Sequence, residues 1–365
     1  MRIQITQSNL HKALTLLSRV ASTKSPLPIL SNILLTAHKG SLELAATNLE
    51  VAITHTARGK VDQEGSVTVP ARLFTDFISQ LPKNETIELV FEKNKLFITA
   101  GSYSSHIQGI AADEFPALPT ISSKETLTVS TKSLQQALTR TMLAASHDDT
   151  RPVLGGVLFH TIDKEVYIAA TDGYRLAESQ IGCQSEIQKS IVPTSTLQDV
   201  QKILQDTSEE SVTLQFEDGQ FGLLCEDTIL VSRLIEGQYP EYSQLIPETS
   251  EISATIAREE LSTAAKLAGL FARESGGSIT LKASENDGNL VVSSVASQVG
   301  DNTSSITGKI SGSGEVVVNV RYLTDALNCF EGDTVTFRFS GAISPCVLTS
   351  ETQPGYQHIV MPLKS

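Results

Sequence analysis

The sequence contains no tryptophan, and only 5% of its 365 residues are aromatic. Its four cysteines lie far apart, so they form neither a metal-ligand motif nor a dense disulfide framework. They are typical of buried thiols in a reducing compartment, and we therefore expect a cytoplasmic protein. No apolar run approaches the roughly 18 residues of a membrane span, and the first ten residues do not resemble a signal peptide. The cysteines are Cys183, Cys225, Cys329 and Cys346.

Catalytic motifs are also missing. The sequence has no glycine-rich phosphate loop and no nucleophile elbow, and its seven histidines show no metal-ligand spacing. The segment 147–149, His-Asp-Asp, is the one cluster that could hold a metal ion or perform acid–base chemistry. Short clusters of this kind are more often polar loops. We therefore expect neither an enzyme nor a protein with a metal or cofactor.

Basic residues are fewer than acidic residues, 28 Lys or Arg against 41 Asp or Glu, so the formal net charge is -13. Such a balance argues against binding nucleic acid over the whole surface. The six segments that we predict to be helical differ, with ten Lys or Arg against six Asp or Glu, which leaves -17 for the rest. Ordinary solvated helix faces would explain this excess, but so would a basic helical surface inside an acidic protein. The predicted helices are 8–20, 71–80, 132–146, 195–205, 258–274 and 321–329.

The chain contains an internal repeat. A shift of 124 positions places similar residues over each other in several segments, and a shift of 249 matches 67–76 to 316–325. Repeated similarity at a fixed offset indicates duplicated structural units. We predict three domains, 1–122, 123–250 and 251–365, separated by polar, turn-rich segments. The segments matched by the shift of 124 are 27–30 with 151–154, 45–48 with 169–172, and 115–116 with 239–240.

Each unit has the pattern of an α+β domain with two helices and about eight short strands. The first helix is predicted from Leu10, Leu14 and Leu17 at helical spacing, after a cap at Ser8 or Asn9. The strands alternate with period two, which favours antiparallel sheet with the helices on one face. At 172–173, Asp-Gly predicts a tight turn between two strands, because glycine readily adopts positive φ.

Several motifs together resemble the bacterial β sliding clamps, the processivity subunits of DNA polymerase III. They are the segments 27–30, 151–156, 170–176, 239–242 and 360–363, within the three-unit layout. The resemblance covers essentially the whole chain. It implies the DNA clamp fold and a head-to-tail homodimer that closes as a ring around double-stranded DNA without sequence specificity. It also implies tethering of the replicative DNA polymerase, the clamp loader and other proteins with a clamp-binding motif. From the residues alone, a monomeric multi-domain peptide-binding scaffold without a DNA role is the alternative.

The resemblance also implies functional residues. For DNA, Lys24 and Arg151 match the family's positions, whereas Arg72, Arg140 and Lys202 are supported by their predicted helices. The family often has tyrosines after the arginine, and Pro152 and Val153 stand there instead, so we do not expect base stacking at that place. The implied partner-peptide pocket consists of Leu154, Thr171, Gly173, Tyr174, Arg175, Leu176, Pro240, Leu245, Ile359 and Met361, with Asn319 and Tyr322 at its edge.

The family's dimer contact corresponds to an edge strand at 102–109 and to a region from Leu270 to about 305. Serines and amides stand where relatives often carry opposite charges, so both sides have lost charge together. We expect strand pairing and packing of Ile107 against Leu270 and Phe271, with little electrostatic steering.

Overall fold

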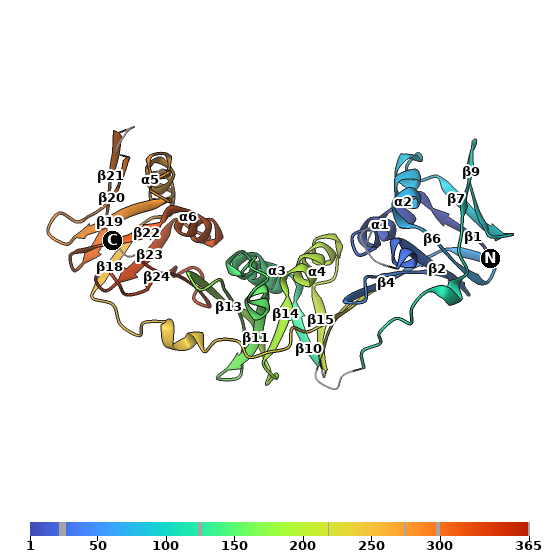
Figure 1. Ribbon diagram of the computed structural model, residues 1–365, viewed down its shortest axis with the longest axis horizontal. Coiled ribbons are helices and arrows are strands. Elements are labelled where there is room, and N and C mark those ends of the chain that lie inside the picture. The colour runs from blue at the N-terminus through green and yellow to red at the C-terminus, as the bar shows by residue number, and fades with distance from the viewer. Residues whose placement is uncertain (22–26, 123–125, 218, 274, 297–299, 364–365) are drawn as a thin grey trace. The chain divides into compact units, whose positions relative to one another are not determined.

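The computed structural model describes residues 1–21, 27–122, 126–217, 219–273, 275–296 and 300–363. It divides into two compact units, one formed by Met1–Gln135 with Ser195–Leu234 and the other by Gln136–Thr194 with Ile235–Ser365. Both units combine sheets with short helices (Figure 1). Within the described residues, no helix is both long enough and apolar enough to cross a membrane.

The first unit holds two antiparallel sheets. The smaller has the order β5 (Lys60–Gln63), β1 (Arg2–Thr6), β7 (Thr86–Glu92), β8 (Lys95–Ala100), β9 (Tyr103–Gln108). The larger has the order β10 (Thr126–Ser130), β15 (Ser211–Glu217), β16 (Gln220–Cys225), β17 (Thr228–Arg233), β4 (Val51–Arg58), β3 (Ser41–Thr47), β2 (Asn32–His38), β6 (Gly65–Pro70). The helices are α1 (Gln7–Leu17), α2 (Ala71–Gln80) and α4 (Thr194–Asp206), with short turns η1 (Pro28–Ser31) and η2 (Ala112–Glu114).

The second unit is built on one continuous sheet of twelve described strands. Their order is β14 (Ser190–Pro193), β11 (Gly156–Ile162), β12 (Glu165–Thr171), β13 (Arg175–Gln184), β25 (Tyr356–Val360), β24 (Cys346–Thr349), β23 (Thr334–Phe339), β18 (Ile252–Ala257), β21 (Gly300–Ser311), β20 (Asn289–Ala296), β19 (Ser278–Ser284), β22 (Gly314–Asn319). Its helices are α5 (Arg258–Phe271), α6 (Val320–Cys329) and the last part of α3 (Thr131–Thr141), with short turns η3 (Met142–Ala144), η4 (Pro152–Gly155) and η5 (Tyr242–Leu245).

The structure confirms the repeat. β6 with α2 occupies 65–80 and β22 with α6 occupies 314–329, an offset of 249 at every boundary. The turn between β3 and β4 matches the turn between β12 and β13 bond for bond. In each, a threonine hydroxyl donates to a carbonyl four residues on, Thr47 Oγ1 to Val51 O at 2.9 Å and Thr171 Oγ1 to Arg175 O at 2.6 Å. Gly173 has φ 91°, as expected of the predicted turn, and Leu49 occupies the same place with φ 77°.

The same kind of strand pair joins successive repeats. β4, the fourth strand of the first repeat, pairs with β17, the last of the second, and β13 pairs in the same way with β25. The fourth strand of the third repeat is β21, which pairs with β20 over residues 300–307 and with β18 only from Gly308 on. β9, the last strand of the first repeat, ends its sheet. Each of these strands therefore has an edge with no strand beside it in the described part of the chain.

The first helix begins earlier than predicted, so a cap at Ser8 or Asn9 is wrong. Thr6 is the N-cap, and its hydroxyl accepts a hydrogen bond from Asn9 N at 3.4 Å. Gln7, in the first turn, is only 3% exposed and donates from Nε2 to the carbonyl of Ile78 on α2 at 2.9 Å. A buried polar residue in the first turn concealed the start of the apolar pattern. The helices α3 and α5 also end earlier than predicted, at Thr141 and Phe271.

Candidate functional site

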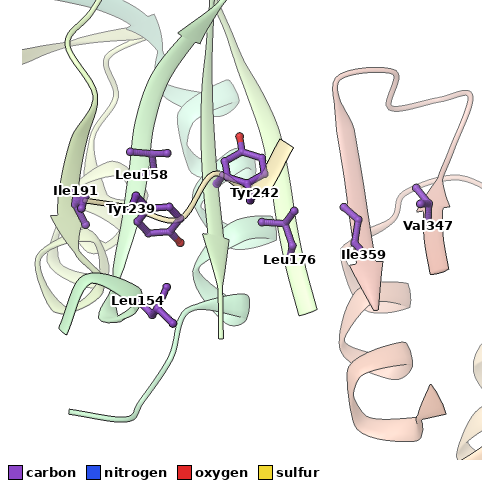
Figure 2. Close-up of a cluster of buried hydrophobic side chains, with 9 residues drawn as sticks. Leu154, Leu158, Leu176, Ile191, Tyr239, Tyr242, Val347 and Ile359 are labelled. Carbon is purple, nitrogen blue, oxygen red and sulfur yellow. The ribbon is translucent and has the colours of Figure 1, made fainter. Parts of the chain in front are cut away.

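The centre of the candidate site is an apolar cluster that spans the junction of β13 with β25. Leu176 on β13 lies opposite Ile359 on β25, which lies opposite Val347 on β24. All three are buried, and Leu154 of η4 packs into the same cluster (Figure 2). Strand register thus brings the predicted residues Leu176 and Ile359 together, and Leu154 joins them by packing from η4.

The sequence analysis missed several apolar residues of this region, among them Val347 and Ile343. Val347 belongs to the cluster, and its signal was a four-residue apolar strand close to the C-terminus. Ile343 is 81% exposed in the loop before that strand. Since Cys346 pairs with Val360, the end of this loop lies close to Met361. Ile343 is thus an exposed apolar residue in the loop whose end lies near the predicted pocket residue Met361.

The turn between β12 and β13 is held by its own side chains. Asp172 Oδ1 accepts hydrogen bonds from the backbone nitrogens of Tyr174 at 2.9 Å and Arg175 at 3.0 Å. Gly173 N donates to Thr171 Oγ1 at 3.0 Å. The Tyr174 ring is left 59% exposed, so the turn presents an aromatic face without burying it. Such a preformed aromatic is suited to contact a partner at little entropic cost.

The C-terminal segment is attached to this turn by backbone hydrogen bonds. Met361 N donates to the carbonyl of Tyr174 at 2.9 Å, and Leu363 N donates to the carbonyl of Val317 at 2.8 Å. The half-buried Met361 is therefore fixed next to the exposed Tyr174. A methionine in such a place offers an adaptable apolar wall.

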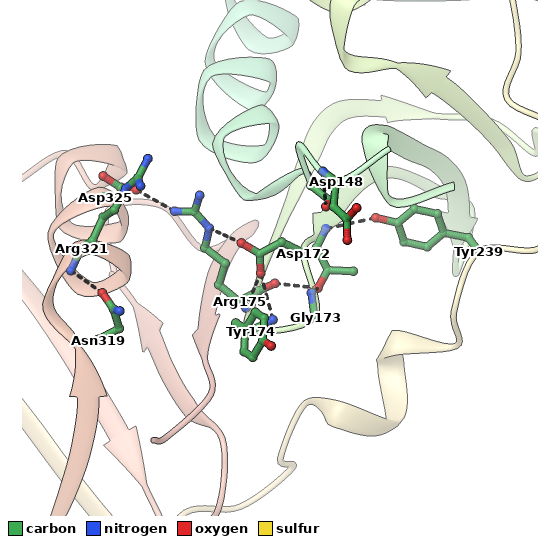
Figure 3. Close-up of polar contacts among 11 residues, drawn as sticks. Asp148, Asp172, Gly173, Tyr174, Arg175, Tyr239, Asn319, Arg321 and Asp325 are labelled. Atoms are coloured by element: carbon green, nitrogen blue, oxygen red, sulfur yellow. Dashed lines mark hydrogen bonds and ion pairs between the residues drawn. The ribbon is translucent and has the colours of Figure 1, made fainter. Parts of the chain in front are cut away.

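Arg175 differs from the expectation that it lines the pocket as a peptide contact. Its side chain is 7% exposed, with Nε 3.1 Å from Asp172 Oδ2 and Nη1 2.6 Å from Asp325 Oδ2 on α6 (Figure 3). The guanidinium also lies 4.8 Å from the centroid of the Tyr322 ring. The arginine thus ties the turn to α6, and its donors are turned away from solvent.

The segment that follows β17 crosses the same sheet and is pinned there. The hydroxyl of the buried Tyr239 accepts a hydrogen bond from Thr171 N at 3.1 Å. Burial raises the pKa of this phenol above its ordinary value, so the hydroxyl keeps its proton. Pro240 and Leu245 are exposed on this segment, Leu245 to 46%. They therefore lie above the cluster as open apolar surface.

The two predicted edge residues, Asn319 and Tyr322, both have structural partners. Asn319 is the N-cap of α6, and its Oδ1 accepts from Arg321 N at 2.9 Å. Tyr322 is covered on one face by Arg175. Both residues orient α6 against the turn.

The predicted DNA-contact residues are in different situations. Lys24 lies outside the described residues. Arg140 does not fit the predicted DNA contact. Its side chain is 13% exposed, pairs with Glu331 at 3.1 Å, and lies 5.6 Å from the centroid of the Tyr356 ring. A largely covered guanidinium that is paired with a carboxylate is not free for a phosphate. The partner Glu331 lies 191 residues away, so a pattern within one helix could not reveal it.

The remaining three basic residues are accessible. Arg72 on α2 has a side chain 86% exposed with a long contact of 3.9 Å to Asp76. Lys202 on α4 is exposed and donates to Gln205 Oε1 at 3.0 Å. Arg151 is 50% exposed and lies 3.8 Å from Asp148. Arg72 and Lys202 belong to the first compact unit, and Arg151 belongs to the second.

The cluster at 147–149 is a polar turn. Asp148 Oδ1 accepts from both the backbone nitrogen and the hydroxyl of Thr150, at 3.0 and 2.8 Å. These hydrogen bonds hold the pKa of the Asp148 carboxyl below its usual value. Within the described ranges, no group of three His, Cys, Asp or Glu residues is arranged to hold a metal ion.

The predicted dimer residues are only partly as expected. Ile107 is 5% exposed and lies opposite Leu96 inside its own sheet. The expectation that Ile107 packs against the partner chain is therefore wrong. Leu270, by contrast, is 58% exposed, and Phe271 is half-buried at the end of α5. On the face opposite Ile107, Phe97 is 41% exposed beside His106, with ring centroids 5.8 Å apart.

Comparison with known proteins adds the family. Models of the N-terminal, central and C-terminal domains of the DNA polymerase III beta subunit match residues 1–119, 128–241 and 243–364. The beta sliding clamp of Synechococcus elongatus is 30% identical over 100% of this chain and 99% of its own.

Two crystal structures show the same fold. The DNA polymerase III beta subunit of Thermotoga maritima has a TM-score of 0.92 and 26% identity, covering 100% of this chain and 99% of its own. The Caulobacter crescentus beta sliding clamp, described with PEG bound to a putative beta-motif tethering region, has a TM-score of 0.93, 25% identity and the same coverage. The chain has the three-domain clamp fold, in which helices and sheets are combined in each domain. It belongs to the DNA polymerase III beta subunit family, the sliding clamps of DNA replication, which are processivity factors and not catalysts.

Proposed function

We propose that the protein closes as a head-to-tail homodimeric ring around double-stranded DNA and tethers the replicative polymerase to it. The observation that carries this proposal is the pair of unpaired strand edges. Within the chain, a fourth strand meets a last strand at both internal junctions, β4 with β17 and β13 with β25. β21 and β9 are the fourth and last strands left over. Pairing β21 of one chain with β9 of another repeats the same junction, and two such contacts between two chains close a ring.

Apolar side chains beside the two edges support this junction. Leu270 is 58% exposed at the end of α5 and Val295 is 71% exposed near the end of β20. On the other side, Phe97 and Tyr103 are 41% and 53% exposed on β8 and β9. With Ile107 turned into its own sheet, we assign Phe97 and Tyr103 as the side chains that meet Leu270 and Phe271. Few charges lie at either edge, so steering by charge is weak.

Replacing Phe271 with alanine is expected to weaken each junction by about 2–4 kcal/mol, because a buried aromatic side chain is lost. The dimer of the unchanged protein is expected to respond weakly to salt. Sedimentation over a series of salt concentrations measures both effects. Ile229→Ala, at an apolar residue 44% exposed on β17, is the matched control and should leave the dimer intact. A dimer that dissociates at high salt, or that ignores Phe271→Ala, contradicts the proposed junction.

We propose that DNA is held by enclosure more than by affinity. The chain carries a net charge of -13, and Arg19, just after α1, and Arg140, on α3, are already paired with carboxylates, so direct phosphate contacts are few. Lys24, Arg72, Arg151 and Lys202 remain the proposed contacts, with Arg140 removed. Residues of this type bind phosphate without reading the sequence of bases. The alternative is a monomeric peptide-binding scaffold without a DNA role. Retention on circular DNA distinguishes the ring from this scaffold.

Protein loaded on a nicked circular DNA is expected to leave when the circle is cut. A ring can slide off a free DNA end, whereas direct contacts with the DNA are unchanged by the cut. Gel filtration of the DNA before and after cutting measures retention. Arg72→Ala with Lys202→Ala should lower loading without altering base preference, whereas Lys60→Ala, an exposed lysine on the strand β5, should not. Equal retention on circular and linear DNA, or no retention on either, contradicts the ring.

We propose that the partner peptide binds over the cluster of Leu154, Leu176, Val347 and Ile359. Its walls are then Tyr174 and Met361 on one side and Pro240 and Leu245 on the other. Gly173 and Thr171 provide the turn between them, and Ile343 extends the apolar margin. Such a groove, apolar with a few polar groups at its edge, suits an aliphatic or aromatic peptide anchor.

Deletion of the last five residues, 361–365, is expected to reduce the affinity for polymerase-derived peptides by about 100-fold or more, since an anchor wall is removed. The fold and the dimer should persist, because β25 ends at Val360 and remains paired with β13 and β24. Fluorescence anisotropy of a labelled peptide measures the affinity, and sedimentation checks the dimer. Unchanged peptide affinity in the truncated protein contradicts this groove.

We also propose a cellular location and limits for the three domains. We place the protein in the cytoplasm with replicating DNA, and its four cysteines are free. Burial raises the pKa of Cys346 to about 12, so this thiol is inert. Domain limits near residues 122 and 250 are supported by the first strands after them, β10 and β18, which begin at Thr126 and Ile252.

A further inference from the structure

A cavity of about 540 Å³ opens next to the proposed partner groove. Its walls come from β11, from the start of β14 and from the segment 237–243. Leu158, Tyr239 and Tyr242 belong both to this cavity and to the apolar cluster, so the two sites share a wall. In Figure 2 the Tyr239 ring lies between Leu158 and Leu154 of the groove. A volume of this size is typical of sites that enclose a small organic group.

One polar group on the cavity wall lacks a partner for one of its atoms. The Tyr242 hydroxyl donates to the Glu178 carboxylate, so its oxygen accepts from His160, whose Nε2 lies 2.6 Å away. Nε2 therefore carries the proton and Nδ1 the lone pair. The other oxygen of Glu178 accepts from Gln357 Nε2 at 2.7 Å, which fixes the arrangement. Among the described residues, no hydrogen bond to Nδ1 of His160 is formed.

Charge at the cavity is balanced. Lys189 Nζ and Glu241 Oε1, both on its wall, pair with each other at 3.0 Å. His160 itself stays neutral, since burial lowers its pKa below the ordinary value. The remaining wall is mainly apolar, with Leu158, Ile162 and Ile191. The cavity therefore suits a neutral, largely apolar group that carries a hydrogen-bond donor for His160.

We propose that this cavity receives an aromatic side chain bearing an N–H or O–H donor, tryptophan or tyrosine, from the polymerase bound in the adjacent groove. The donor bonds Nδ1 of His160, and the ring lies against Tyr239, Leu158 and Ile191. Continuity with the groove makes the occupant part of the same partner chain. This assignment of the partner rests on the proposed function, whereas the chemistry of the cavity does not.

The cavity is tested first with N-acetyl-tryptophanamide. Because the chain has no tryptophan, the fluorescence of the probe reports its environment directly. A saturable blue shift is expected, lost in Ile162→Arg, which places a charge at a wall residue 39% exposed. Leu245→Arg, in the groove, is the matched control and should keep the shift. N-acetyl-phenylalaninamide, without a side-chain donor, should compete about fivefold more weakly than the tryptophan compound, as expected for one hydrogen bond.

The partner is tested with the whole replicative polymerase and with a short groove peptide derived from it. Ile162→Arg should weaken the polymerase about tenfold or more and leave the short peptide unchanged, whereas Leu245→Arg should weaken both. Absence of the blue shift overturns the cavity as a site for this chemistry. A blue shift together with unchanged polymerase affinity in Ile162→Arg overturns the polymerase as its occupant. If neither polymerase nor peptide binds the unchanged protein, the proposed function fails, while the probe still decides the cavity.

Discussion

Replacing Arg175 with methionine is expected to lower the free energy of unfolding by about 3–5 kcal/mol, because a buried cation is removed and its carboxylates are left behind. Asp172 and Asp325 are 16% and 33% exposed in their side chains and approach the guanidinium to 3.1 and 2.6 Å. The same change should also lower the affinity for partner peptides, since the turn that carries Tyr174 loses its attachment to α6. Arg175 is therefore expected to act as a positioning residue, because its guanidinium is bound by the two carboxylates.

Arg140 supplies the matched control. It too is an arginine packed against a tyrosine ring and paired with a carboxylate, but neither partner belongs to the turn at 171–175, and its partner Glu331 is 62% exposed. Arg140→Met should therefore cost less stability and leave peptide affinity unchanged. Thermal unfolding and fluorescence anisotropy measure the two effects. In the double variant Arg175→Met with Asp325→Ala, part of the stability should return, because one uncompensated charge is gone. Equal losses of peptide affinity in the Arg140 and Arg175 variants would show that general stability, and not the turn, is responsible.

Acid should destabilise the protein through His358. Its imidazole is fully buried, with Nε2 unpaired among the described residues and Nδ1 3.1 Å from the Tyr356 hydroxyl. Burial first, and the nearby Arg175 charge second, lower its pKa from 6.5 to about 3. In the unfolded chain the imidazole binds a proton near pH 6.5, whereas in the folded protein it does so only near pH 3. The contribution of neutral His358 to the free energy of unfolding is therefore complete above pH 6.5. It is lost as the pH falls from 6.5 to 3, at about 1.4 kcal/mol per pH unit.

His358→Leu should reduce this slope between pH 6.5 and 4, where His55 and His160, whose pKa values burial also lowers, retain a contribution. The free energy of unfolding in urea at several pH values measures the slope. His38→Gln, at an exposed residue that ends β2, is the control and should leave the slope as it is. If the slope survives in the His358 variant, the imidazole is not the acid-sensitive group.

The sequence predicted the fold through local signals that the structure retains. Helical spacing of leucines located α1, and the Asp-Gly pair located the turn at 172–173, because these features depend on neighbours in the chain. The shift of 249 also relates β6 and α2 to β22 and α6, although α6 begins at Val320, one residue before the predicted start. The start of α1 was missed because Gln7 is polar yet buried against α2, which is a tertiary contact.

The candidate site was predicted less completely, for physical reasons. The sequence placed Leu154, Leu176 and Ile359 in one pocket through family resemblance, while Val347 depended on the register of β24. Arg140 and Arg175 were taken as available side chains, but each is paired with a carboxylate at least 150 residues away. The burial of Ile107 escaped notice because serines dominate β9 and hide its alternation. Contacts between distant segments decide these cases, and no local pattern reports them.

The paired turns at 47–51 and 171–175 also record how a duplicated gene diverges. Leu49 and Gly173 adopt the same left-handed backbone, with φ 77° and 91°, and the same surrounding hydrogen bonds. A leucine there costs about 1–2 kcal/mol relative to glycine, so the first copy has tolerated that loss. The turn itself therefore does not oblige the chain to keep glycine. In the second copy, a Cβ at residue 173 would lie 3.5 Å from Arg151 Nη1, which is an ordinary contact, so glycine there relieves the left-handed backbone and is not needed to make room.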